Sequence, residues 1–388
     1  MINSEIPWPL IGGDKLRVYY LGKILATKYE TDLLCINEGR ANAETIAELK
    51  KVFNQVFVFP FPKTSFFINK ILGLFSKKPV QVRCFYFRKV QKWIDNNIGN
   101  YDIIWCHLIR TAEYVKDIKI KKIIDFADAL SKNYKMVIKI ARGLKKALYF
   151  IEGKRLLNYE LEILNAFDLA LITSTVDRDY ILNKYERRDK DILIIPMGVK
   201  EELLEREFNS QEESWISFLG AMSYAPNEDA VLYFTKKVFP KIKKKIANIN
   251  FYAIGKTSKK TLSLKGNPGI RITGILRDPY RYLEGSKIVV ASLRAGTGIQ
   301  NKVLEGMALG KTVVTTPTGA SGIPEAKNGE HFIVIDPKNP DEMADKIIEL
   351  MKNDKERKRI GDNAKKLILE NYTWEKIGKI LLENICKL

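Results

Sequence analysis

The chain has 388 residues, 46% of them hydrophobic, and this length suits two domains of ordinary size better than one core. Its 65 basic and 46 acidic residues give a formal net charge of +19. No apolar run approaches the roughly 20 residues that a membrane span needs, and the amino-terminal residues lack the pattern of a signal peptide, so neither a membrane-spanning nor a secreted protein is expected.

Apolar, strand-like runs alternate with helical patterns along the chain, which predicts βα units and largely parallel sheets. In the first half, the expected strands are residues 31–37, 56–60, 103–107, 122–128, 169–174 and 192–198. In the second half, they are residues 215–222, 249–255, 270–274, 287–293, 311–317 and 331–336. A polar stretch over 200–214 separates the two sets. We therefore predict an α/β fold with two similar Rossmann-like domains that face each other across a deep cleft.

The domains are expected at residues 1–200 and 211–370, followed by an amphipathic helix over 371–388 that packs back on the first domain. In open parallel sheets, ligands bind at the carboxyl ends of the strands. With two such domains, the predicted site is the cleft between them.

The positive charge is uneven, because residues 51–150 contain 20 basic and 6 acidic residues, interleaved with aromatic ones. Such a surface suits an anionic membrane or an anionic lipid-linked substrate. A nucleic acid is the other standard partner of a basic surface. The sequence contains no nucleic-acid recognition motif, so a nucleic-acid partner is not expected. The plain alternative is a solvated lysine-rich surface over an aromatic core. The four cysteines are scattered and fit neither a zinc site nor a disulfide framework, which indicates a reducing cytoplasm.

The most informative segment is residues 292–310, which follow an apolar run and open a helix. Gly296 and Gly298 let the backbone approach a ligand, and the helix after them presents unpaired N–H groups and a partial positive charge, which suits phosphate. Lys302 adds a full charge in the first turn. Glu305 lies one turn deeper on the same face, where a carboxylate can accept hydrogen bonds from ribose hydroxyls. The segment predicts a nucleotide or nucleotide-sugar site.

The same segment is not the dinucleotide-binding fingerprint. The third glycine of that motif is expected at position 301, where the chain has Asn301. Thr315 and Thr316 stand where a ribose-binding acid is needed. By spacing alone, a glycine-rich loop with an ordinary surface pair of lysine and glutamate explains the pattern equally well.

Three sets of residues form one larger pattern. The first is IPWP at 6–9 with GGDKLR at 12–17. The second is WISFLGAM at 215–222 with PNEDA at 226–230. The third is IQNKVLEGMALGK at 299–311 with TGASGI at 318–323. Together they resemble glycosyltransferase family 4, the group 1 glycosyl transferases with the GT-B fold, and within it the sugar transferases of exopolysaccharide and PEP-CTERM systems.

The resemblance implies transfer of a sugar, with retention of anomeric configuration, from a UDP- or GDP-sugar to a glycan or lipid-linked acceptor in polysaccharide or glycoconjugate biosynthesis. It implies no cofactor and no metal. The protein is expected in the cytoplasm, with a peripheral position at the inner face of the cell membrane. The resemblance also implies that the departing phosphate deprotonates the acceptor, so that no dedicated base is needed.

The resemblance also implies roles for individual residues. The residues implied to bind the donor are Gly12, Gly13, Gly220, Arg294, Gly296, Gly298, Asn301, Lys302 and Glu305. The residues implied to act in catalysis are His107, which matches the histidine that contacts the donor sugar, together with Lys302 and Glu305. Asp125 and Asp128 end a strand near the expected cleft, where they either contact the acceptor or cap the edge of the core.

The chain departs from the family pattern at three places. The family's first glutamate lies eight positions before the second, which gives Thr297 here. Many members carry a basic residue shortly after Gly220, where this chain has residues 221–223, Ala-Met-Ser. Residues 1–6 leave room for a shortened first strand, or the sequence starts late. These departures keep a second hypothesis open, a catalytically degenerate GT-B module in a glycan-synthesis complex.

Asp177 and Asp179 formally match the metal-binding DxD motif of the other glycosyltransferase fold. They follow Ser174 and Thr175 at an expected helix start, where acidic side chains suit the helix dipole. We therefore expect helix capping here and no metal site.

Overall fold

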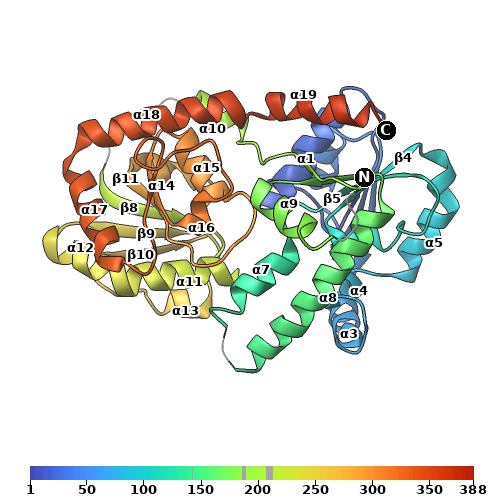
Figure 1. The fold of residues 1–388 in the computed structure, drawn as a ribbon, viewed down its shortest axis with the longest axis horizontal. Coiled ribbons are helices and arrows are strands. Elements are labelled where there is room, and N and C mark those ends of the chain that lie inside the picture. The colour runs from blue at the N-terminus through green and yellow to red at the C-terminus, as the bar shows by residue number, and fades with distance from the viewer. Residues whose placement is uncertain (142, 186–188, 207–212) are drawn as a thin grey trace. The chain divides into compact units, whose positions relative to one another are not determined.

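The computed structural model describes residues 1–141, 143–185, 189–206 and 213–388, and it divides into two compact units (Figure 1). Unit 1 comprises Met1–Met197 together with Trp374–Leu388, and unit 2 comprises Gly198–Thr373. The expected start of the second domain at residue 211 lies outside the described residues, as do residues 207–212 of the polar stretch.

Unit 1 is built on a seven-stranded parallel sheet with the order β3-β2-β1-β4-β5-β6-β7. Its strands are β1 (Ile2–Asn3), β2 (Leu33–Glu38), β3 (Val56–Phe61), β4 (Ile103–His107), β5 (Lys121–Asp125), β6 (Leu169–Ile172) and β7 (Leu193–Ile194). Side chains of β2 alternate between two cores, because Leu33 and Cys35 join one apolar cluster and Leu34 and Ile36 join another. Both faces of the sheet are therefore covered, as parallel sheets require.

The first strand is present but short. Residues Ile2–Asn3 pair in parallel with β2 on one side and with β4 on the other. The chain thus keeps a central strand at the position where the sequence predicts a shortened one. Gly12, with a φ of 96°, then precedes helix α1 (Gly13–Leu25).

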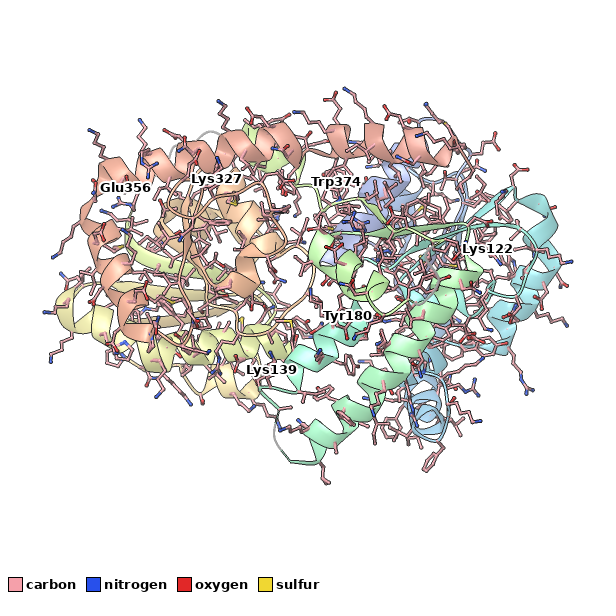
Figure 2. The ribbon with its side chains drawn as sticks, viewed as in Figure 1. Lys122, Lys139, Tyr180, Lys327, Glu356 and Trp374 are labelled. Atoms are coloured by element: carbon pink, nitrogen blue, oxygen red, sulfur yellow. The ribbon has the colours of Figure 1, made fainter. Side chains whose placement is uncertain are left out.

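The other helices of unit 1 connect or cover the strands. They are α2 (Ala43–Leu49), α3 (Lys63–Leu74), α4 (Val80–Cys84), α5 (Arg88–Asn97), the 3-10 helix η1 (Ile98–Asn100), α6 (Ile109–Ala112), α7 (Leu130–Val137), α8 (Leu144–Ala166), α9 (Thr175–Leu182) and α19 (Trp374–Ile385). Helix α19 packs on α1 although it comes from the far end of the sequence. Trp374, labelled in Figure 2, stacks on Tyr20 with ring centroids 4.9 Å apart, and Gly378 leaves room for Ile24.

Unit 2 contains a six-stranded parallel sheet with the order β10-β9-β8-β11-β12-β13. Its strands are β8 (Glu213–Leu219), β9 (Asn250–Ile254), β10 (Ile270–Gly274), β11 (Ser286–Ala291), β12 (Thr312–Thr315) and β13 (Ile333–Val334). Its helices are α10 (Glu201–Glu205), α11 (Ala225–Tyr233), the π-helix η2 (Phe234–Val238), α12 (Phe239–Lys245), α13 (Lys259–Leu262), α14 (Tyr280–Gly285), α15 (Asn301–Ala308), α16 (Pro317–Ala320), α17 (Pro340–Lys352) and α18 (Asp354–Asn371).

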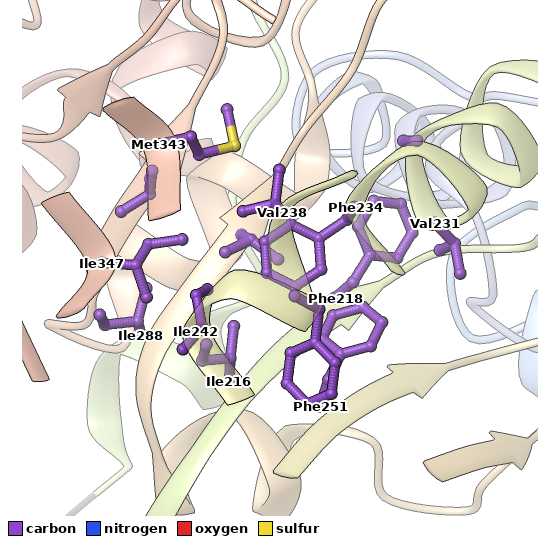
Figure 3. Close-up of a cluster of buried hydrophobic side chains, with 14 of the residues drawn as sticks. Ile216, Phe218, Val231, Phe234, Val238, Ile242, Phe251, Ile288, Met343 and Ile347 are labelled. Carbon is purple, nitrogen blue, oxygen red and sulfur yellow. The ribbon is translucent and has the colours of Figure 1, made fainter. Parts of the chain in front are cut away.

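The core of unit 2 lies on both faces of strand β11. Ile288 and Val290 belong to the large apolar cluster that includes Phe218 and Phe251 (Figure 3). Val289 points the other way, where helix α15 approaches so closely that a Cβ at Gly306 would lie 3.3 Å from the Val289 side chain. This packing fixes α15 against the sheet.

The prediction of two α/β domains with parallel sheets is confirmed, although several strands end earlier than expected. The strand expected over 122–128 ends at Asp125, because Ala127 adopts a positive φ of 55° that extended backbone does not allow. The strand expected over 311–317 ends at Thr315, because the Thr316 side chain accepts a hydrogen bond from the Gly319 N–H and begins helix α16.

Candidate functional site

The glycine-rich loop of unit 2 connects β11 to α15. Gly298 has a φ of 64°, in the left-handed region that favours glycine, and Gln300 is the residue before the helix. Gly322 supports the loop from behind, because a Cβ there would lie 2.7 Å from the Gly298 carbonyl oxygen. The first N–H groups of a helix have no partner within the helix, so this end of α15 can bind an anion.

Lys302 lies in the first turn of α15 and is buried, with 8% of its surface exposed. Its ammonium donates a hydrogen bond to Gln300 Oε1 at 3.2 Å and lies 5.7 Å from the centre of the Phe218 ring. Within the described ranges, no carboxylate lies within salt-bridge distance of this ammonium. Burial lowers the pKa of Lys302 from 10.5 to about 8, while Glu305 acts to raise it. The site therefore holds a cation whose charge is poorly compensated.

Gly220, at the carboxyl end of β8, is brought to the same place. A Cβ on Gly220 would lie 3.3 Å from Lys302 Cε and 2.9 Å from Asn227 Nδ2. Asn227 in turn donates a hydrogen bond from Nδ2 to the Ala221 carbonyl oxygen. The absence of a side chain at residue 220 thus lets two strand-end loops approach each other around the lysine.

Glu305 lies one turn after Lys302 and contacts a residue far away in sequence. The Tyr280 hydroxyl donates a hydrogen bond to Glu305 Oε1 at 3.0 Å, and the Lys200 ammonium lies 5.0 Å from the centre of the Tyr280 ring. Burial raises the pKa of Glu305, while Tyr280, Lys200 and Lys302 lower it. The carboxylate is therefore held in one orientation by Tyr280 in a mostly cationic surrounding.

The remaining predicted residues of unit 2 differ in their surroundings. Asn301 is the first residue of α15 and half-buried, and Gly296 adjoins the Gln300 side chain. Thr297 is buried, and its hydroxyl has no hydrogen-bond partner among the described residues. Arg294 instead forms a two-point ion pair with Asp229, at 2.8 and 2.5 Å, so much of its charge is neutralised by that partner.

In unit 1, His107 and Asp125 end neighbouring strands and contact each other. His107 Nδ1 lies 2.9 Å from Asp125 Oδ2, and both side chains are buried. Arg17, buried in α1, donates hydrogen bonds to both Asp125 oxygens at 2.8 and 2.9 Å and from Nη1 to the Ile195 carbonyl oxygen at 2.7 Å. Burial acts to raise the pKa of Asp125, but the Arg17 guanidinium and His107 have the larger, opposite effect. The pKa of Asp125 therefore lies well below its usual range.

These contacts orient the histidine. The Asp125 carboxylate accepts a hydrogen bond from His107 Nδ1–H, which leaves Nε2 as the outer nitrogen of the ring. Nε2 is buried and has no hydrogen-bond partner in the part of the chain that the structure describes. The next residue, Leu108, has a positive φ of 62°, a conformation that is costly for a leucine. Unit 1 therefore holds an oriented imidazole with one unsatisfied nitrogen at the end of β4.

Asp125 and Asp128 have different surroundings. All the Asp125 contacts described above are to groups inside unit 1, so its structural role is to hold Arg17 and His107. Asp128 is half-buried and accepts a hydrogen bond from the Thr173 hydroxyl at 3.3 Å. Burial, together with Asp177 and Asp14, raises the pKa of Asp128 to about 8. Asp14 follows Gly12 and Gly13, so this glycine turn lies near Asp128.

Asp177, the first acidic residue of the DxD pattern, contacts other residues of unit 1. The Asp177 backbone N–H donates a hydrogen bond to the Ser174 hydroxyl at the start of α9, and the Asp177 carboxylate pairs with Lys132 Nζ at 2.6 Å. In the residues described, no cluster of three or more His, Cys, Asp or Glu side chains is arranged to hold a metal ion. No described helix is long and apolar enough to cross a membrane.

Three residues that contact the predicted site residues were assigned no role from the sequence: Arg17, Tyr280 and Gln300. The position of Arg17 could have indicated its role, since it is a charged residue between Leu16 and Val18 in the first helix. Nothing in the sequence indicates the contacts of Tyr280 with Glu305 and of Gln300 with Lys302, because these depend on tertiary packing and on one side-chain conformation.

Comparison with known proteins shows what the chain is similar to. Residues 213–353, most of unit 2, match the family model described as "Glycosyl transferases group 1". An uncharacterized glycosyltransferase of Methanocaldococcus jannaschii, MJ1069, is 28% identical over 225 residues, covering 55% of this chain and 56% of that protein. The chain thus spans about half the length of the curated relatives it matches.

Solved structures resemble the whole chain. Anabaena Alr3699/HepE, in complex with UDP and glucose, gives a TM-score of 0.72 at 13% identity, covering 100% of this chain and 99% of that one. WaaG, a glycosyltransferase involved in lipopolysaccharide biosynthesis, gives 0.69 at 12% identity, covering 98% of each chain. At these identities the likeness shows the fold, which is the α/β GT-B class with two Rossmann-like domains.

Proposed function

We propose that the protein is a glycosyltransferase that moves a sugar from a nucleotide-sugar to an acceptor hydroxyl, with the nucleoside diphosphate bound at the start of α15. The observation that carries this proposal is the buried Lys302 ammonium, which has no carboxylate partner among the described residues. A diphosphate supplies the missing negative charge. The match of residues 213–353 to the group 1 glycosyl transferases and the UDP bound to Alr3699/HepE support the same conclusion.

The chemistry assigned to unit 2 is electrostatic. The bond between the sugar C1 and the diphosphate oxygen breaks, and negative charge develops on the leaving diphosphate. Lys302 and the N–H groups at the start of α15 stabilise that charge because they are already oriented and shielded from water. Glu305 holds the ribose hydroxyls through Oε2, since Tyr280 donates to Oε1.

His107 is assigned the contact with the transferred sugar, because its Nε2 is oriented and has no hydrogen-bond partner among the described residues. The new bond forms between C1 and the acceptor oxygen on the face that the diphosphate leaves, so the configuration is retained. A diphosphate oxygen takes the acceptor proton, which makes a separate base unnecessary. The acceptor is proposed to be a glycan or lipid-linked glycan, and the reaction needs no metal ion.

A donor panel tests the proposal. UDP-, GDP-, ADP- and CMP-sugars are compared for thermal stabilisation of the protein and for slow release of nucleotide, with and without EDTA. One nucleotide class is expected to raise the melting temperature and to be hydrolysed slowly without added metal. The anomer formed with a simple alcohol acceptor, determined by NMR, tests retention.

Glu305→Ala and Glu284→Ala form the matched pair of variants for this assay. Glu284 is a buried glutamate of unit 2 that pairs with Arg206 and not with the loop before α15. Only Glu305→Ala is expected to lose nucleotide binding. Binding without hydrolysis or transfer for any donor would favour the degenerate binding module, for which Thr297 in place of the first glutamate is the argument. No stabilisation by any nucleotide would refute both.

A further inference from the structure

Helix α3 of unit 1 exposes its apolar face to solvent. The exposed side chains form two adjacent stripes at helical spacing: Phe67, Ile71 and Leu74, and Ile68, Leu72 and Phe75. Phe67 is 63% and Phe75 is 86% exposed. A helix on the surface of a globular protein normally shows the opposite arrangement, with its apolar stripe toward the core.

The inner face of α3 explains how the helix is held in this orientation. Asn69 Nδ2 donates a hydrogen bond to the Tyr86 carbonyl oxygen at 3.1 Å. Gly73 is buried, and a Cβ there would lie 3.1 Å from the Val80 backbone. Phe66 packs against Phe85 and Phe87. Phe66, Asn69 and Gly73 thus face the protein, and the other large apolar side chains of α3 face outward.

The first half of α8 continues this surface. Leu144, Leu148 and Ile151 are exposed and lie on one side of the helix, at positions i, i+4 and i+7. Arg155, four residues further on the same side, donates hydrogen bonds to the Gly73 and Leu74 carbonyl oxygens at the end of α3. The two helices therefore meet at the Arg155 contact, and Figure 1 shows them side by side. We call their exposed apolar side chains the α3–α8 face.

The charge of the segments that carry this face has one sign. The sequence between Glu48 and Asp95 contains ten basic residues and no acidic one, and the sequence between Asp128 and Glu152 also lacks acidic residues. Lys70 and Lys77 border the apolar stripes of α3, and Lys145 and Lys146 border those of α8. None of these four lysines forms an ion pair with another described residue.

We propose that the α3–α8 face docks on an anionic lipid bilayer, with its apolar side chains in the boundary between headgroups and acyl chains and its lysines beside acidic phospholipid headgroups. An outward apolar face with a basic border is the pattern of an interfacial helix. The charge complementarity selects anionic lipid over a second copy of this chain, since two such faces would repel each other.

The position of the face also fits the candidate site of unit 1. Helix α3 begins just after β3 ends, and α8 follows the carboxyl end of β5 through α7. In a parallel sheet these ends share one edge with the end of β4, where His107 lies. The face therefore brings this edge near the bilayer surface, where a lipid-linked acceptor would be found. This last link rests on the proposed function, whereas the docking itself does not.

Flotation of the full chain with vesicles tests the proposal. Vesicles of phosphatidylcholine alone are compared with vesicles that also contain phosphatidylglycerol, at low and high salt. The protein is expected to float with the anionic vesicles and to detach as salt rises, because salt screens the lysines. Phe67→Ser/Ile71→Ser/Phe75→Ser is expected to lower the partition coefficient at least about tenfold. Lys70→Gln/Lys77→Gln is expected to lower it about fivefold per lysine on anionic vesicles.

Leu369→Ser/Ile380→Ser is the matched control, because both residues are exposed aliphatic side chains on helices α18 and α19. This variant is expected to bind like the unmodified protein, and all variants are expected to keep its melting temperature, since the replaced side chains are exposed. Equal partition of the α3 variant and the control would overturn the proposal, as would equal binding to neutral and anionic vesicles. An α3 variant that dissociates a dimer without changing vesicle binding would identify a second copy as the occupant. Nucleotide binding is measured in parallel, so a failure of docking is distinguishable from a failure of the proposed function.

Discussion

Replacing Lys302 by methionine separates the effect of this residue on folding stability from its effect on nucleotide binding. Burial lowers the pKa of Lys302 from 10.5 to about 8, which corresponds to about 3 kcal/mol of destabilisation of the folded protein at pH 7. Methionine has a similar length and no charge, and it loses the hydrogen bond to Gln300, worth about 1 kcal/mol. Lys302→Met is therefore expected to stabilise the protein by about 2 kcal/mol in the absence of nucleotide.

The same variant is expected to bind the nucleoside diphosphate more weakly. A hydrogen bond from an ammonium to a phosphate contributes about 1.5–3 kcal/mol, so the dissociation constant should rise tenfold or more. Calorimetry with the nucleoside diphosphate selected by the donor panel measures this change, and thermal unfolding without nucleotide measures the stability.

The pH dependence gives an independent check. The pKa of Lys302 is lower in the folded than in the unfolded protein, so its penalty is complete below pH 8 and disappears as pH rises from 8 to about 10.5. The unmodified protein should gain stability relative to Lys302→Met over this interval. Its affinity for the diphosphate should fall over the same interval, because the ammonium loses its proton.

Lys122, labelled in Figure 2, provides the control for this experiment. It is a buried lysine of unit 1 whose pKa is also lowered by burial, but its ammonium donates to the Lys116 and Ile118 carbonyl oxygens. Lys122→Met leaves two carbonyl groups unsatisfied and should destabilise the protein without changing nucleotide affinity. A lower melting temperature of Lys302→Met would refute the burial penalty of Lys302, and unchanged affinity for the diphosphate would refute its contact with the ligand.

Two further variants test the contacts around the candidate residues. Asp125→Asn leaves the Arg17 guanidinium buried without its carboxylate and should cost about 3 kcal/mol of unfolding free energy in urea. Because folding lowers the pKa of Asp125, the difference in unfolding free energy between the two proteins should persist from pH 8 to 5 and narrow below about pH 4. Equal stability of the two proteins at pH 7 would contradict a buried ion pair. Tyr280→Phe should weaken UDP or GDP binding about fivefold through the loss of its hydrogen bond to Glu305, and the 2′,3′-dideoxy nucleotide should bind both proteins equally. Equal loss for both nucleotides would show that Tyr280 does not act through the ribose.

The fold was largely predictable because the pattern that identifies it is local. Apolar runs such as 103–107 and 270–274 coincide with strands β4 and β10, because a buried parallel strand needs little more than a short apolar segment. Strand β1 escapes this pattern, since two residues have no periodicity, and its central place depends on pairing with β2 and β4. The early end of β5 also could not be predicted, because the positive φ of Ala127 has no local sequence signal and its carbonyl oxygen accepts a hydrogen bond from Thr173, 46 residues away.

The candidate site was predictable as a set of residues but not as a network. The spacing of Gly298, Lys302 and Glu305 can be seen in the sequence, and the structure places all three on one loop and the helix after it. Burial of Lys302 depends on Phe218, and the orientation of Glu305 depends on Tyr280; both partners come from other strands and helices.

The return of the chain to unit 1 at Trp374 has a consequence for the order of folding during synthesis. Unit 2 is one uninterrupted segment, so all of its strands and helices have been made before the ribosome reaches α19. Most of unit 1 is translated before unit 2, but unit 1 receives helix α19 only after unit 2, when Trp374 stacks on Tyr20 of α1. Unit 1 is therefore completed only after unit 2 has been made, and α1, which carries Arg17 and follows the Gly12–Gly13 turn, lacks its outer packing until α19 has been translated.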